Sequence, residues 1–189
     1  MNQNIDPRKE QKAKAGHQEI QGETIAKFEF FDNGFNPYSR YLDIDRVDLI
    51  LRKRYGTNIK YIEVQVKYGR LYDCGEKWAQ KNFDHTSWKN ISLDAFKDCP
   101  NDNLYVVYVL SHPDRGYKGD IFIFPLKDFN HLLKSAIRIN SKKGVQAKMN
   151  IAHCKQNDRW YLWKKRNFTD MDDPNNIIDV TKYRRNFDI

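Results

Sequence analysis

Three polar side chains of different chemistry alternate along one short segment of the chain. Within residues 61–68, Glu63, Gln65 and Lys67 are separated from one another by single apolar residues. Successive side chains of a β-strand point to opposite faces, so these three would project side by side. Carboxylate and amide oxygens are ligands for hard cations such as Mg²⁺. The alternative is a half-exposed strand with an ordinary polar outer face.

A carboxylate interrupts a second apolar segment, residues 46–52. Asp48 lies between Val47 and Leu49, although aspartate is disfavoured in the middle of a strand. If this strand is central, the buried carboxylate needs a partner or a metal ion. If Asp48 instead lies on an exposed face with Arg46 and Arg52, no metal is required.

A third acidic residue lies on a predicted helix, residues 17–32. Glu23 lies one turn after Ile20 and two turns before Phe30, on the apolar side that should face a sheet. The remaining members of that apolar side are Ile25, Phe28 and Phe31. The alternative is a glutamate at the rim, paired with Lys27 at i+4.

The elements that must position these residues follow from periodicity and turn residues. The helix ends at Asn33-Gly34, and the turn at residues 55–58 joins strands 46–52 and 59–68 into a hairpin. After a mixed segment with a short helix near 92–97, the chain offers strands 104–110 and 120–124, a helix at 126–139, and a hairpin of 145–153 with 159–165. This order predicts an α/β fold, with a mixed sheet and helices on its faces.

The length of 189 residues fits one domain. We predict a flexible basic and polar tail for residues 1–15, a single domain for 16–170 and a C-terminal extension for 171–189.

Three short motifs resemble those of one nuclease family. They are Gly22-Glu23, Val47-Asp48-Leu49 and Val64-Gln65-Val66-Lys67. Together they resemble the PD-(D/E)XK nuclease superfamily, in particular the Mrr-like branch in which glutamine replaces the second acid. The resemblance covers about residues 16–140. It implies a restriction-endonuclease-like mixed central sheet flanked by helices, here with a C-terminal hairpin addition.

The chain departs from the pattern of the superfamily at two positions. Val47 stands where proline is frequent, and Gln65 stands in the second acid position, which removes one charge from the site. Glu63, two residues earlier on the same face, could supply the missing carboxylate.

The resemblance also implies roles for these residues around Mg²⁺ or Mn²⁺. Asp48 would be the central metal ligand, assisted by Glu23, the side-chain oxygen of Gln65 and the carbonyl of Val66. Lys67 would position the attacking water or stabilise charge on the phosphate, because a lysine beside carboxylates stays protonated.

The charge of the chain favours a polyanionic partner. Lysine and arginine number 33 against 25 acidic residues, a net charge of +8. The basic clusters that could contact DNA phosphates are Arg52-Lys53-Arg54, Lys142-Lys143 and Lys164-Lys165-Arg166. Each cluster could equally be a solvated turn, and the aromatic residues at 160, 161 and 163 are more often core than base-stacking.

Several site classes find no support in the sequence. Cys74, Cys99 and Cys154 show no C-x-x-C spacing, which argues against a disulfide framework and structural zinc and suits a reducing cytoplasm. We assign no metal to the scattered histidines: His85, His112, His131 and His153. We expect no membrane span, no secretory signal and no small-molecule cofactor.

Two functions of different classes remain. The first is a Mg²⁺-dependent DNA endonuclease of restriction or DNA-processing type, acting as a homodimer to cut both strands. The second is a nuclease-fold module that binds nucleic acid or a protein partner without strong catalysis.

Overall fold

The computed structural model describes the backbone of residues 7–39, 46–96, 103–141 and 144–189, with side chains from residue 16 onward. In chain order its elements are α1 (Pro7–Asp32), β1 (Asn36–Ser39), β2 (Leu49–Tyr55), β3 (Asn58–Arg70), β4 (Tyr72–Asp73), β5 (Phe83–Ser92), β6 (Leu104–His112), β7 (Gly116–Pro125), α2 (Leu126–Ser135), β8 (Ile137–Ser141), β9 (Gly144–Cys154), β10 (Arg159–Trp163), β11 (Ile177–Asp179) and the 3₁₀ helix η1 (Thr181–Tyr183). The chain is therefore α/β, as expected from its sequence.

The strands form two sheets. The first sheet is mixed and has five strands in the order β1-β2-β3-β6-β7. The hairpin of β2 and β3 forms around the predicted turn, and β3 pairs in parallel with β6. The face assignment of β3 is confirmed, because Ile62, Val64, Val66 and Tyr68 are all buried on one face. The uninterrupted apolar run of β6 is covered on both faces, as such a run predicts.

A second sheet, all antiparallel, has the order β11-β10-β9-β5-β4, with β8 also pairing β9. The expectation of one central sheet with an added C-terminal hairpin was therefore wrong in that detail. The hairpin of β9 and β10 belongs to a full sheet because β5 pairs along most of β9. β5 escaped prediction because residues 84–90 are largely polar and show no strand-like alternation of apolar residues.

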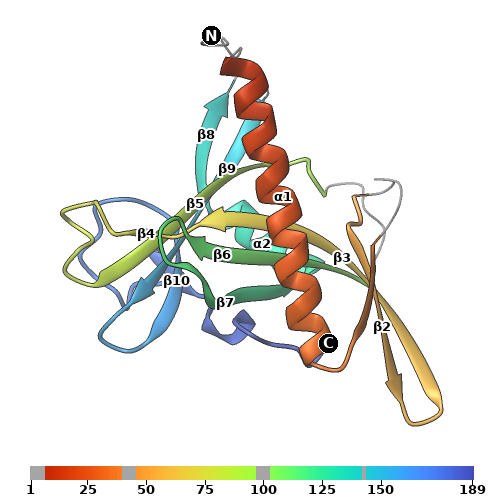
Figure 1. Ribbon diagram of the computed structural model, residues 1–189. Helices are drawn as coiled ribbons and strands as arrows, with labels where there is room; N and C mark the ends of the chain where they lie inside the picture. Colours follow the sequence, from red (N-terminus) through yellow and green to blue (C-terminus); the bar gives the residue numbers. More distant parts are fainter. Residues whose placement is uncertain (1–6, 40–45, 97–102, 142–143) are drawn as a thin grey trace.

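The core has two main layers around the first sheet. One face packs against the second sheet and α2 through Leu104, Val106, Tyr108, Met149 and Ile151, among others. The other face packs against α1 through Ala26 and Phe30, and Figure 1 shows α1 crossing the strands of that face. The C-terminal segment completes this second layer with Ile189, so residues 171–189 are part of the fold rather than an appendage.

Helix α1 differs from the prediction in length and orientation. It begins at Pro7, so residues 7–15 are helical where we expected a flexible tail. Those residues are rich in lysine, glutamate, glutamine and alanine, which favour helix. Ile20, Phe28 and Phe31 were expected on the sheet side, but each is more than 60% exposed, at 65%, 67% and 64%. A helix lying on a sheet buries one stripe only, here that of Ala26 and Phe30.

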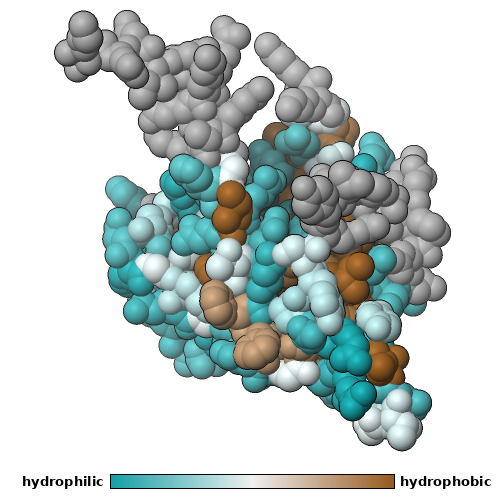
Figure 2. All heavy atoms as spheres, turned by 45° about the vertical axis from the view of Figure 1, so that its right-hand side comes forward, coloured by the Kyte–Doolittle hydropathy of each residue, from teal (hydrophilic) through white to brown (hydrophobic). Residues whose placement is uncertain are grey.

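The surface that includes α1 is largely hydrophilic, with separate apolar patches (Figure 2). Helix α2 ends at Ser135, earlier than the predicted 139, because residues 137–141 pair with β9 as β8. In the part of the chain that the structure describes, no helix combines the length and apolarity that crossing a bilayer requires.

Candidate active site

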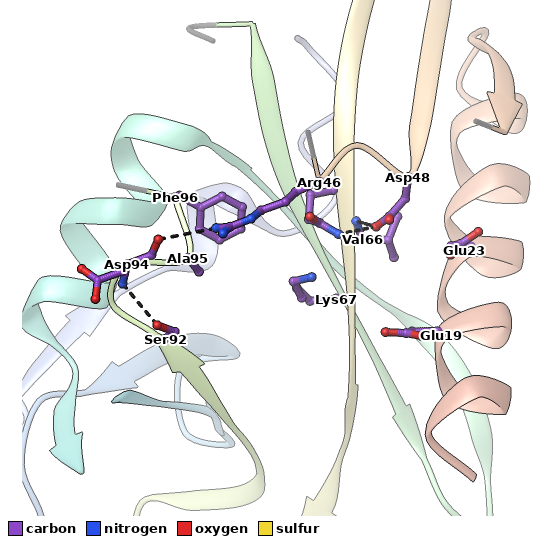
Figure 3. A pocket seen from close by; sticks show the side chains of 11 residues that line it. Glu19, Glu23, Arg46, Asp48, Val66, Lys67, Ser92, Asp94, Ala95 and Phe96 are labelled. Carbon is purple, nitrogen blue, oxygen red and sulfur yellow. Dashed lines mark hydrogen bonds between the residues drawn. The ribbon is translucent and has the colours of Figure 1, made fainter. Parts of the chain in front are cut away.

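A pocket of about 630 Å³ opens beside β3, between α1 and the segment that follows β5 (Figure 3). Its wall includes five residues selected from the sequence: Glu23, Asp48, Gln65, Val66 and Lys67. The other lining residues are Glu19, Arg46, Ser92, Asp94, Ala95 and Phe96. The structure thus brings together residues from α1, from the start of β2 and from the middle of β3.

The pocket exists because two paired strands have different lengths. β2 begins at Leu49, opposite Val64, whereas β3 continues to Arg70. The opposite edge of β3 stays paired with β6 along this stretch. Among the described strands, none accompanies β3 beyond Val64 on the β2 side. Main-chain groups of alternate residues therefore point from this open edge towards the pocket.

Asp48 forms hydrogen bonds with the first main-chain groups of this open edge of β3. Its N–H donates to the Val64 carbonyl (2.8 Å), and its Oδ2 accepts from the N–H of Val66 (2.6 Å). The same Oδ2 accepts from Nε2 of Gln65 (2.7 Å). Asp48 lies one residue before β2 rather than in mid-strand, and it is half-buried. Its carboxylate therefore takes the place of a missing ladder partner.

The same contacts orient two further oxygen atoms. The N–H and C=O of one strand residue point to the same side, so the carbonyl of Val66 faces the edge that Asp48 occupies. Gln65 is buried, at 7% exposure, and turns its nitrogen to Asp48. Its Oε1 is then the atom of the amide that could bind a cation.

Helix α1 packs on the face of β3 that carries Val66, and it supplies two carboxylates to the pocket from that side. Glu19 and Glu23 are one helical turn apart and both line the pocket. In Figure 3 they lie on the α1 side, while Ser92, Asp94 and Phe96 lie across β3 from them. Glu19 was not selected from the sequence, although its i, i+4 spacing from Glu23 is a signal that could have identified it.

Two lysines lie close together near the open edge. Lys67 projects from the face of β3 opposite to Val66 and lines the pocket. Lys89 of β5 donates from Nζ to the carbonyl of Tyr68 (2.8 Å), the next main-chain acceptor along the same edge. Burial lowers the pKa of Lys89 below its ordinary value; Lys67 adds to this shift and Glu19 opposes it. Lys89 lies in the mixed segment, where no sequence pattern singled it out.

The backbone is strained at one lining residue. Arg46 has a φ of 60°, in the left-handed region that non-glycine residues rarely adopt. Its Nη1 donates to the Asp94 carbonyl at 3.5 Å, which connects the start of β2 to the segment after β5. Strain of this kind tends to persist where the surrounding structure imposes it, often at functional sites.

Glu63 is not brought into this pocket. It lies opposite Ile50, inside the paired part of the hairpin, and is absent from the lining residues. The structure therefore does not support Glu63 as a replacement for the second acid, since a step of two residues along a strand moves a side chain about 7 Å away.

The predicted basic clusters lie at different places. Arg52, Lys53 and Arg54 are on β2, and the Lys53 ammonium stacks over Phe35 at 4.1 Å and lies 5.4 Å from the Tyr55 ring. Lys164 follows β10 and donates to the Pro174 carbonyl, with Lys165 exposed beside it. Lys142 and Lys143 lie outside the described residues. Aromatic residues 160, 161 and 163 are buried, which confirms their assignment to the core.

A second group of polar side chains lies where β4, β5 and β6 meet. Asp73, His85 and His112 each offer one ligand atom, and these atoms lie within 4.8 Å of one another, so the group could hold a metal ion. The sequence predicts no metal at these histidines, because their spacing shows no metal motif. The tertiary structure brings them together across the two sheets.

Neighbouring charges hold this second group in place. Arg115 Nη2 donates to Asp73 Oδ1 (2.6 Å) and to His112 Nδ1 (3.2 Å). Burial lowers the pKa of His112, and Arg115 and His85 add to the shift. Burial acts to raise the pKa of Asp84, but the hydrogen bond from His153, the nearby imidazoles of His153 and His85 and a backbone hydrogen bond together outweigh it, so the pKa is lowered.

Comparisons with protein-family models, with curated proteins and with solved structures found no match to the chain.

Proposed function

We propose that the protein is a Mg²⁺-dependent nuclease that hydrolyses phosphodiester bonds of DNA at the pocket beside β3. The observation that supports this proposal most directly is that Glu23, Asp48, Gln65 and Lys67 line one pocket although they come from three separate elements. The resemblance of the three sequence motifs to PD-(D/E)XK nucleases supports the same reading.

The donor set suits a hard divalent cation. The pocket carries four carboxylates, of Glu19, Glu23, Asp48 and Asp94, against the two basic side chains of Arg46 and Lys67. Mg²⁺ prefers oxygen ligands and is usually held by one or two carboxylates plus waters. Asp48, Glu23, Oε1 of Gln65 and the carbonyl of Val66 would hold it. When bound, the ion supplies Lewis-acid polarisation of the phosphate and a lower pKa for a coordinated water.

The protein's own residues would position the substrate and stabilise charge. The ammonium of Lys67 would contact a non-bridging phosphate oxygen, where negative charge grows in the transition state. Lys89 would reinforce this positive charge from β5 of the second sheet, since it lies close enough to Lys67 to have its pKa lowered by it. The bond between Asp48 and Val66 would hold the Asp48 carboxylate in a fixed orientation.

The proposal also includes basic side chains outside the pocket and a second copy of the chain. Arg52 and Arg54 on the β2–β3 hairpin would contact the DNA backbone, and a net charge of +8 would assist the encounter. Cutting both strands requires two sites, so we propose a homodimer.

A cleavage assay on plasmid DNA with Mg²⁺ or Mn²⁺ tests the proposal. We expect Asp48→Asn and Lys67→Ala to lower the cleavage rate by at least about 100-fold, because each removes a group that acts on the reacting phosphate. Asp172→Asn and Lys127→Ala are the matched controls: both residues are exposed and lie outside the pocket, and both variants should cut like the wild type.

The second candidate is a module that binds nucleic acid without cutting it. Glutamine at position 65 favours this candidate, because an amide gives the metal site one charge less than a carboxylate. If the wild-type protein binds DNA but leaves duplex, branched and single-stranded substrates intact with either metal, the nuclease proposal fails and the binding module stands.

A further inference from the structure

The group of Asp73, His85 and His112 lies apart from the proposed nuclease pocket and contributes nothing to it. Asp73 ends β4 and pairs with His85 of β5 across the second sheet. His112 ends β6, a strand of the first sheet. The three residues therefore meet at the junction of the two sheets.

The ligand atoms are close to the spacing that a metal ion imposes. Nε2 of His85 lies 3.8 Å from Oδ1 of Asp73, and the two imidazole rings stand perpendicular with centroids 4.8 Å apart. Ligand atoms about 2.0–2.2 Å from a tetrahedral zinc ion are separated from one another by roughly 3.3–3.6 Å. Small side-chain rotations would close the difference.

A carboxylate lies behind His85, in the position from which metal sites orient a histidine. Nδ1 of His85 is buried and lies 3.2 Å from Oδ1 of Asp84, although the contact lacks hydrogen-bond geometry. Asp84 is itself fixed by His153, whose Nδ1 lies 2.8 Å from it and whose Nε2 lies 2.9 Å from Asp158. A carboxylate behind one ring nitrogen directs the other nitrogen towards a metal. Here that other nitrogen, Nε2, is the one that approaches Asp73.

A positive group already lies between two of the ligands. Arg115 only donates hydrogen bonds, so Nδ1 of His112 accepts from it, and its lone pair points towards the same Nη2 atom that Oδ1 of Asp73 binds. The guanidinium thus marks a position where a cation bridges Asp73 and His112. Arg115 has a half-exposed side chain and lies in the turn between β6 and β7, so it can swing into solvent.

We propose that Asp73, His85 and His112 bind a divalent transition-metal ion, Zn²⁺ by preference, with water in the fourth position and with Arg115 displaced. Two imidazoles and one carboxylate form a donor set that zinc accepts, whereas Mg²⁺ prefers oxygen ligands alone. Because β6 belongs to the first sheet and β4 and β5 to the second, the ion clamps the two sheets together.

Cobalt titration of the full chain, without Mg²⁺ or nucleic acid, tests this site directly. Co²⁺ in a four-coordinate site with nitrogen and oxygen ligands has a visible absorption spectrum, and Zn²⁺ should abolish it by displacement. We expect one Co²⁺ per chain and a rise in the unfolding temperature with Zn²⁺, because a ligand that binds the folded state stabilises it.

Cobalt binding to single-substitution variants distinguishes a metal site from a cluster that is held only by ion pairs. His85→Ala and His112→Ala should remove the spectrum, and Asp84→Asn should weaken cobalt binding by about 10–100-fold. Arg115→Ala should strengthen binding, since it removes the competing cation. His131→Ala, at an exposed position on α2, is the matched control and should bind like the wild type.

Three outcomes would overturn the proposal. One is the absence of cobalt binding in both the wild type and Arg115→Ala. Another is a spectrum that survives in His85→Ala and His112→Ala, which would place the ion elsewhere. The third is an equal rise in unfolding temperature with Zn²⁺ in the wild type and in these two variants.

Discussion

At the scale of single residues, Asp48 links the fold to the proposed chemistry. Its Oδ2 accepts bonds from Val66 and Gln65, so one carboxylate both ends the ladder of β2 and lies in the pocket. A carboxylate that is held by hydrogen bonds before the metal arrives needs little reorganisation to bind it. Gln65 donates to this carboxylate and also lines the pocket, so it is the most informative residue to change.

Gln65→Glu should make the protein depend on a metal for its stability. The substitution removes the hydrogen bond from Nε2 and places a second carboxylate against Asp48, so we expect a loss of about 1–3 kcal/mol without metal. Mg²⁺ should restore stability and raise the cleavage rate by adding a charged ligand. Thermal unfolding with and without Mg²⁺ measures both effects. An unfolding temperature equal to that of the wild type in both conditions would contradict this role of position 65.

Tyr108 should make the folded state sensitive to alkaline pH. Burial raises its pKa to about 12, with a smaller opposing effect from the hydrogen bond with Ser87. In the unfolded chain tyrosine ionises near pH 10. Stability from this group is therefore complete below about pH 10 and is lost as pH rises towards 12, by about 1.4 kcal/mol per pH unit.

Tyr108→Phe cannot ionise and should lack this dependence. Below pH 10 the variant should be less stable by about 0.5–1.5 kcal/mol, through loss of the Ser87 hydrogen bond. Above pH 10 the difference should shrink and reverse. Urea unfolding of both proteins from pH 8 to pH 11.5 measures it, and a constant difference across that range would refute the assignment.

At the scale of elements, the site depends on how closely α1 approaches β3. A Cβ added at Gly22 would lie 3.0 Å from Cβ of Tyr68, so glycine permits the helix to pack against this strand. Glu23 is the next residue and lines the pocket. The distance between α1 and β3 therefore decides whether Glu23 can act together with Asp48.

A pair of glycine substitutions on α1 tests this dependence. Gly16→Ala meets nothing within 4 Å and should stabilise the protein by about 0.5–1 kcal/mol through helix propensity. Gly22→Ala gains the same propensity but crowds Tyr68, so we expect a net destabilisation of about 1 kcal/mol and slower cleavage. Urea midpoints compare the two. Equal stabilisation by both substitutions would show that the helix does not pack this closely.

At the scale of the whole molecule, the net charge of +8 is divided among separate surfaces. The pocket itself is acidic, whereas Arg52 and Arg54 lie on the hairpin of β2 and β3, the same two elements that carry Asp48 and Lys67 towards the pocket. This arrangement suits a polyanion that is bound along the hairpin and acted on at a metal site.

The salt dependence of DNA binding measures the contribution of that hairpin. Arg52→Gln with Arg54→Gln should weaken binding to any duplex sequence and reduce the slope of log K against log salt by about 1–2, since each phosphate contact contributes about 0.9. Lys127→Gln with Lys134→Gln removes the same charge from exposed positions on α2. If both pairs change the slope equally, binding follows net charge and not the hairpin.

The sequence by itself determined the α/β class, the β2–β3 hairpin and five of the eleven residues that line the pocket. These features depend on local periodicity: alternation along β3 places Gln65 and Lys67 on the same face, and helical spacing places Glu23 on the side near the sheet. The exposed outer face of α1 was not predictable in this way, because a helix rich in apolar residues does not reveal which stripe the sheet will cover.

Only the tertiary structure decided the second sheet, the start of β2 at Leu49 and the cluster at the sheet junction. Asp73, His85 and His112 lie far apart in the sequence and belong to strands of different sheets. Their proximity arises from strand pairing over long sequence separations, which leaves no periodic signal within any one segment. For the same reason the sequence did not single out Lys89, whose Nζ donates to the Tyr68 carbonyl at the open edge of β3, or Asp94, which lines the pocket. Glu63, only two residues from Gln65, does not line the pocket.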